Sequence, residues 1–175
     1  KMDPIYLATK QDNKRIIQIL NESGVSTNHN DLDDDGFHQL HNLASDGDIR
    51  MIKKLLEKGV YDVDIQDEEA SRTPLIFAFY SKNPLQIVKA LVKAGANVNH
   101  EDENNDGAPL HAAIEHCNSE NIEEFSKAIE FLIDNGADVN LAASVYDMGE
   151  ITPLELAAKK SKNISKKLLK ILKPQ

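Results

Sequence analysis

Two acidic segments of this chain place oxygen-bearing side chains at alternate positions, Asp31–Gly36 and Asp102–Gly107. Carboxylate and amide oxygens at the first, third and fifth positions, followed by glycine, begin the calcium-binding loop of an EF-hand. The twelfth position of that loop should be a bidentate glutamate, but it is Asn42 in one segment and Ala113 in the other. The sequence therefore predicts neither a calcium site nor any other metal site.

The chain also holds a neighbouring histidine and cysteine, His116 and Cys117, which could form a thiol–imidazole pair. No nucleophile motif surrounds them, and a zinc site would need a second pair of ligands at suitable spacing. We therefore predict no catalytic residue, no enzyme activity and no cofactor. Because Cys117 is the only cysteine, an internal disulfide is excluded, which suits a reducing, intracellular compartment.

A short sequence motif recurs along the chain at a nearly constant interval, and it predicts the helices that position these side chains. Its clearest copy opens at Thr73-Pro74-Leu75 and closes at residues 95–99, Gly-Ala-Asn-Val-Asn. The position of the proline recurs after 35, 35, 35 and 44 residues, at Pro4, Gln39, Pro74, Pro109 and Pro153. Such a period predicts a stacked array of short units rather than a globule with one central site.

Each unit reads as two helices followed by a turn. Proline suits the first turn of the first helix, where its missing N–H has no partner in the helix. Apolar residues at helical spacing follow in the second helix. Glycines at the left-handed position that ends a helix close these second helices, at Gly24, Gly59, Gly95 and Gly136.

The long last interval contains nine extra residues. Six lengthen the link between the two helices of the fourth unit, at Asn118–Glu124, and three enlarge the following loop, Ala142–Glu150. That loop contains Val145, Tyr146 and Met148. Inserted segments often carry recognition, but tolerated drift explains them equally well, and both readings stay open.

The repeated openings resemble those of the ankyrin repeat family. They are Thr73-Pro74-Leu75, Ala108-Pro109-Leu110-His111-Ala112-Ala113 and Thr152-Pro153-Leu154-Glu155-Leu156-Ala157-Ala158, with a degenerate copy at Asp35–His41 and a capping copy at Asp3–Ala8. The resemblance covers essentially the whole chain. It implies an all-α ankyrin-repeat solenoid of helix-turn-helix units joined by β-hairpin loops.

We expect a single domain over residues 1–175. Its approximate repeats are 1–34 (the N-terminal cap), 35–69, 70–104, 105–148 with both insertions, and 149–175 (the C-terminal cap).

Members of this family usually bind partners through the hairpin tips and the exposed, concave face of the first helices. Carried over to this sequence, the tips are Phe37, Glu68, Glu69, Arg72, Glu103, Asn104 and Asn105. The first-helix positions are Asn42, Ser45, Asp46, Phe77, Tyr80, Ser81, Glu115 and His116. Phe37, Phe77 and Tyr80 could anchor a partner, or they could instead pack in the core.

The resemblance also assigns structural roles to several polar residues. His41 and His111 occupy the family's usual histidine position, where the ring hydrogen-bonds loop backbone between repeats. Asn99 and Asn140 resemble the asparagine that hydroxylases modify in many ankyrin proteins, although the same residues stabilise the turn.

Charge is unevenly distributed along the chain. The net charge is −9, yet residues 159–175 hold seven lysines and no acid. A polar outer face on the last repeat, which stops further stacking, is the preferred explanation of these lysines, and a nucleic-acid or membrane role for this segment is the alternative. Acidic residues cluster in three of the predicted loops, at Asp31–Asp35, Asp67–Glu69 and Glu101–Asp106.

If the hairpin tips line up, these clusters form an acidic ridge suited to a partner protein with a basic face. Solvated loop charge without a partner is the alternative. The acidic body argues against nucleic acid, and no apolar run is long enough to span a membrane.

These observations predict a non-enzymatic protein–protein interaction module, expected to be monomeric and intracellular. Three roles stay open. The chain could be a host-directed effector of an intracellular bacterium or virus, which would place it in the host cell cytoplasm. It could be a targeting or spacer domain of a larger, even enzymatic, protein. It could also be a small inhibitor that occludes a partner's functional face.

Overall fold

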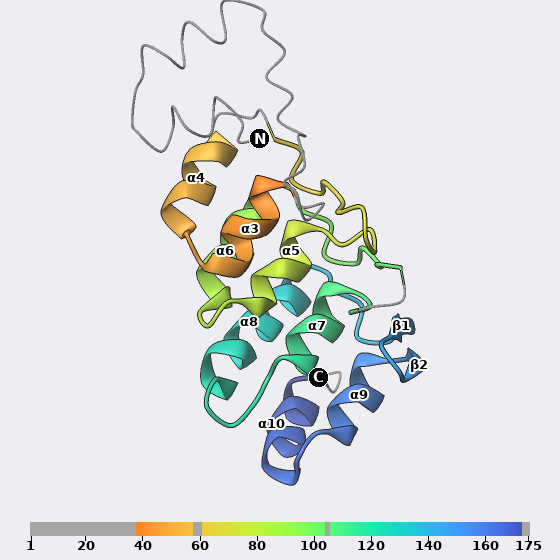
Figure 1. The fold of residues 1–175 in the computed structure, drawn as a ribbon. Helices are drawn as coiled ribbons and strands as arrows, with labels where there is room; N and C mark the ends of the chain where they lie inside the picture. The colour runs from red at the N-terminus through yellow and green to blue at the C-terminus, as the bar shows by residue number, and fades with distance from the viewer. Residues whose placement is uncertain (1–37, 58–60, 104–105, 173–175) are drawn as a thin grey trace, which may run out of the picture.

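The computed structural model describes residues 38–57, 61–103 and 106–172 (Figure 1). The predicted N-terminal cap and the acidic run at residues 31–35 lie outside these ranges, as do Phe37, Asn104 and Asn105.

The described residues form pairs of antiparallel helices stacked along one axis (Figure 1). The helices are α3 (Gln39–Asp46), α4 (Ile49–Glu57), α5 (Pro74–Phe77) continued by the 3-10 helix η1 (Ala78–Tyr80), α6 (Pro84–Lys93), α7 (Pro109–Glu115), α8 (Ile122–Asp134), α9 (Pro153–Lys159) and α10 (Lys162–Leu172). One small sheet joins β1 (Ala143–Val145) to β2 (Gly149–Ile151). This mostly helical stack confirms the predicted fold class.

Two layers of helices enclose the core. The first helices α3, α5, α7 and α9 contact one another in sequence, as do the second helices α4, α6, α8 and α10. Buried aliphatic and aromatic side chains fill the space between the layers, among them Leu40, Ile52, Leu55, Leu75, Phe79, Leu91, Leu110, Phe125 and Leu132. The apolar side chains that the sequence places at helical spacing therefore face the core.

The second helices end as predicted at Gly95 and Gly136, whose φ angles are 101° and 92°. Only glycine adopts this left-handed conformation without strain. The N–H groups of Ala96 and Ala137 then bond back to the carbonyls of Leu91 and Leu132 at 3.1 and 3.0 Å. The chain can thus turn away from the helix towards the next repeat.

The first insertion differs from the prediction, which placed all six extra residues in the link between helices. Helix α8 begins fourteen residues before Gly136, whereas α6 begins eleven before Gly95, so residues 122–124 form an additional helical turn. Ile122 packs against the core, and Glu123 and Glu124 carry negative charge near the positive end of the helix, which favours this extension.

The second insertion forms a β-hairpin rather than the loop that we predicted. Ala143 pairs with Ile151, Ser144 with Glu150 and Val145 with Gly149. Apolar residues at alternate positions explain the strands, because Ala143, Val145 and Ile151 are buried while Glu150 is exposed.

Candidate functional site

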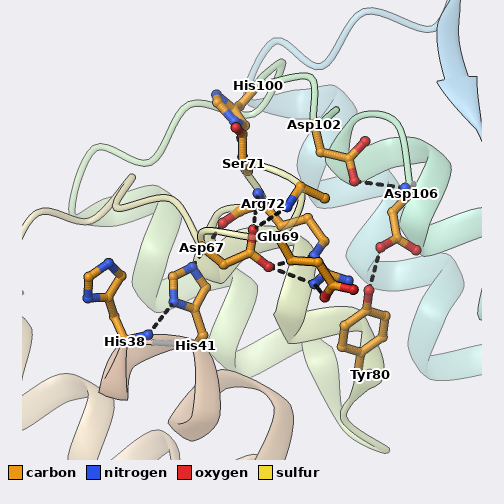
Figure 2. Close-up of polar contacts among 11 residues, drawn as sticks. His38, His41, Asp67, Glu69, Ser71, Arg72, Tyr80, His100, Asp102 and Asp106 are labelled. Atoms are coloured by element: carbon orange, nitrogen blue, oxygen red, sulfur yellow. Dashed lines mark hydrogen bonds and ion pairs between the residues drawn. The ribbon is translucent and has the colours of Figure 1, made fainter. Parts of the chain in front are cut away.

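The loops that join one repeat to the next lie along one edge of the stack (Figure 1). Two of these loops are built around equivalent aspartates. Asp67 Oδ1 accepts the N–H groups of Ala70 and Arg72 at 3.1 and 2.8 Å. Asp102 accepts the N–H of Asp106 at 2.7 Å (Figure 2) and that of Gly107 at 2.8 Å. Both carboxylates thus hold a tight turn in place.

Arg72 was predicted as a surface contact but is 7% exposed. Its Nε donates to Asp67 Oδ2 at 2.7 Å and its Nη2 to Glu69 Oε2 at 2.6 Å (Figure 2). The guanidinium also lies 5.0 Å from the centroid of the Phe77 ring. Burial alone would lower the pKa of Arg72, but the hydrogen bond and charge of Asp67 raise it above its ordinary value. Arg72 therefore belongs to the interior of the loop and stays charged.

The two aspartate-centred loops are also bonded to each other. The N–H of Glu103 donates to the carbonyl of Ala70 at 2.7 Å, and Ser71 Oγ donates to Glu103 Oε1 at 3.0 Å. His100 Nε2 lies 2.7 Å from the carbonyl of Ser71 (Figure 2). Glu68, Glu69 and Glu103 are exposed on this connected pair of loops, which we call the acidic edge.

A row of rings crosses the first helices beside the acidic edge. Successive ring centroids along His38, His41, Phe77, Tyr80 and His116 are 5.6, 4.8, 5.2 and 4.7 Å apart. Phe77, for which an anchor role and core packing were both open, is 5% exposed and packs within this row, so it supports the surface rather than forming it. Tyr80 and His116 are partly exposed.

Tyr80 and His116 meet the loops through Asp106. The Tyr80 hydroxyl donates to Asp106 Oδ2 (Figure 2). His116 Nε2 lies 3.7 Å from Asp106 Oδ1. Burial and the hydrogen bond to Asp106 both raise the pKa of Tyr80, which keeps the phenol protonated. Burial would raise the pKa of Asp106, but its bonds to His116 and Tyr80 lower it. The repeat period could not predict this network, because Tyr80, Asp106 and His116 occupy non-equivalent positions in adjacent repeats.

The other predicted site residues divide by exposure. Asp46 is exposed, while Asn42, Ser45 and Glu115 are partly buried. Ser81 is 7% exposed and was wrongly placed on the surface. Its hydroxyl lies against Gly47 at the end of α3, where an added Cβ would stand 2.9 Å from Ser81 Oγ, and accepts the N–H of Asn83. Glu115 also pairs with Lys160, the residue after α9, at 3.5 Å.

The histidines at the family position link repeats, as predicted. Nε2 of His41 lies 2.9 Å from the carbonyl of Arg72, and Nε2 of His111 lies 2.8 Å from that of Ile151. Each Nδ1 accepts a backbone N–H of its own repeat, so each ring is neutral and donates through Nε2. Burial lowers the pKa of His41 to about 4 and also lowers that of His111.

The thiol considered for nucleophilic chemistry is buried. Cys117 is 2% exposed, and burial raises its pKa despite the nearby charges of Lys160 and Lys167. Its thiolate form is therefore disfavoured, which is the opposite of what an active nucleophile requires.

Comparison with known proteins identifies the repeats. The family model described as ankyrin repeats (3 copies) matches residues 40–143, more than half of the chain. The chain belongs to the ankyrin repeat family. Ankyrin repeats are generally protein–protein interaction modules and typically lack catalytic activity.

Two curated relatives are similar to this ankyrin chain. The nuclear factor NF-kappa-B p105 subunit of Gallus gallus is 29% identical over 157 residues, which are 89% of this chain and 14% of that protein. An ankyrin repeat protein of fowlpox virus (strain NVSL) is 29% identical over 115 residues, 66% of this chain and 17% of that protein. This chain thus spans less than a fifth of either relative. None of the helices in the described ranges has the length and apolarity needed to cross a bilayer.

Proposed function

We propose that this ankyrin chain binds a partner protein along the acidic edge and the adjacent first-helix face. The observation that carries the proposal is the bonding between the two loops. Because Glu103 bonds to both Ala70 and Ser71, the described residues of the two loops hold one another in place without a partner. A surface that is already ordered loses little conformational entropy when it binds.

The partner that fits this surface is a protein with a basic face. Arg72 is an example, within the chain itself, of how a cation is bound here: two carboxylates and an aromatic ring contact its guanidinium. Glu69 remains 68% exposed despite this contact, and Glu68 and Glu103 are exposed beside it. An arginine or lysine of the partner would meet the exposed carboxylates of Glu68, Glu69 and Glu103 from outside. The charges would mainly raise the association rate and select against acidic partners.

Reversing the charge of the acidic edge tests this proposal. We expect Glu68→Lys, Glu69→Lys and Glu103→Lys together to slow association with a partner isolated by pull-down, and to weaken its dependence on salt. Association rates should be measured at several ionic strengths, after a thermal melt shows that the variant is folded.

The matched control reverses three exposed acids on the α7–α8 link and α8, through Glu120→Lys, Glu130→Lys and Asp134→Lys. Both variants change the net charge equally. An equal loss of rate in both would show that only net charge matters, and unchanged rates in the first variant would contradict the proposal.

We also propose that the chain acts as a monomer within cells. Effector, targeting and inhibitory roles all require the same binding step, so the charge-reversal experiment applies to each. The similarity to a viral ankyrin repeat protein supports the effector role without naming a partner.

A further inference from the structure

The β1–β2 hairpin occupies the place that an aspartate-centred turn occupies in earlier repeats. His41 bonds the carbonyl of Arg72, which directly precedes Thr73-Pro74, and His111 bonds the carbonyl of Ile151, which directly precedes Thr152-Pro153. Equivalent histidine hydrogen bonds therefore hold the Asp67 turn and the β1–β2 hairpin to the stack. The hairpin continues the line of loops beyond the acidic edge (Figure 1).

Side chains of both strands and of the turn fix the hairpin to the solenoid. Val145 and Ile151 are each 4% exposed, and Met148 packs against the core. Val145 lies against the neighbouring loop, because a methyl group added to Gly107 would stand 3.2 Å from Val145 Cγ2. The tip is thus held at a defined position next to the loop that carries Glu103.

The tip presents an aromatic ring to solvent. Tyr146 is 67% exposed, and among the described residues only Leu154 is another exposed large hydrophobic side chain. The turn that presents the ring is closed by the N–H of Met148 bonding to the carbonyl of Val145 at 2.9 Å. Asp147 and Glu150 beside it are exposed, and residues 143–152 contain no lysine or arginine.

We propose that Tyr146 is the anchor for an arginine or lysine in an extended basic segment of the partner, a proposal that rests on the proposed function. A cation over the face of a tyrosine is attracted by the ring, and the carboxylates of Asp147 and Glu150 add to that attraction. A flat, rigid aromatic side chain loses little entropy on contact, which suits an anchor.

The spacing of the repeats sets the spacing of the partner's charges. Packed helices lie about 8–10 Å apart, so successive loops follow at about that interval. An extended chain in the polyproline II conformation advances about 3.1 Å per residue and has three residues per turn, so every third side chain points to the same side. The segment should therefore carry a basic residue at about every third position, with one cation at Tyr146 and others along the acidic edge.

A synthetic peptide tests this inference, with arginine at every third position, serine between and a fluorescent label. We expect it to bind the full chain in an anisotropy titration, and the same peptide with glutamate in place of arginine not to bind. Tyr146→Ala should weaken binding about two- to fivefold, while Tyr146→Phe should retain it because the ring remains. Leu154→Ala, at the other exposed hydrophobic residue, should leave affinity unchanged.

The charge-reversed acidic-edge variant in the same titration separates the two proposals. If that variant loses affinity while Tyr146→Ala does not, the anchor is wrong and the acidic edge stands. If Tyr146→Ala loses affinity and the charge reversal does not, the acidic edge is wrong. A failure of the wild-type chain to distinguish the arginine peptide from the glutamate peptide would overturn both. Thermal melts of the variants exclude unfolding as a cause, and Tyr146 is exposed enough that its loss opens no cavity.

Discussion

The neutral rings of His41 and His111 hydrogen-bond neighbouring repeats, and protonation at low pH should weaken this link. His41 is fully buried, with Asp67 and His38 the charged or titratable groups near it, and it gives its single N–H to the next repeat. Protonation would place a charge in a site that excludes water and would abolish the acceptor role of Nδ1. The folded state therefore resists protonation that the unfolded chain accepts.

This difference predicts a loss of stability on acidification. With a folded pKa of about 4 and an ordinary value of 6.5, the unfolded chain binds more protons between these values. The free energy of unfolding should thus fall as the pH drops below 6.5, by about 2 kcal/mol between pH 7 and pH 5 from His41 alone. Urea unfolding at pH 7 and at pH 5 measures this change in the free energy of unfolding. His41→Gln should show a correspondingly smaller pH dependence, and an equal dependence in both proteins would contradict the prediction.

Arg72 gives a second test at this scale. Replacing it with methionine keeps the apolar stem but leaves the buried Asp67 carboxylate without its cation. We expect the free energy of unfolding to fall by about 3–5 kcal/mol, as when one partner of a buried ion pair is removed. A change below about 1 kcal/mol in chemical denaturation would mean that the pair does not stabilise the loop. Lys53→Met, at an exposed position on α4, is the control.

At the scale of the element, the second helices supply the apolar stripe that each repeat buries. Leu91 of α6 is fully buried, whereas Val92 beside it is only partly buried. Leu91→Ala should therefore lower the free energy of unfolding by about 2–5 kcal/mol through the cavity that it leaves. Val92→Ala, which removes less buried surface, should cost clearly less. Equal losses in urea denaturation would refute the assignment of the buried face.

The helices that repeat with the period could be predicted from the sequence, whereas the conformation of the two insertions could not. Repeated prolines and glycines mark helix starts and ends because each satisfies a backbone requirement that few residues meet. Residues 122–124 and the hairpin have no counterpart in the other repeats, so the period says nothing of their conformation. Only the alternation of Val145 and Ile151 with polar residues indicates strands there.

At the scale of the whole molecule, the stack determines which predicted site residues reach the surface. The resemblance to the ankyrin family assigned Arg72, Phe77 and Ser81 to surface positions on the loops and first helices, yet all three side chains are buried. Their direction depends on partners elsewhere in the chain, such as Asp67 for Arg72 and the His41 ring for Phe77. Position within a repeat is a local property, while exposure is a property of the assembled stack.

The bonds between the two loops of the acidic edge have a consequence for how this surface can change. Ser71 holds Glu103 through its hydroxyl and meets His100 through its carbonyl, so neither loop is positioned independently. Substitutions at Ser71 and Glu103 should then have non-additive effects on affinity, in contrast to sites that share no contact. A lineage adapting to a new partner would have to alter adjacent repeats together, so recognition here evolves by pairs of repeats rather than one at a time.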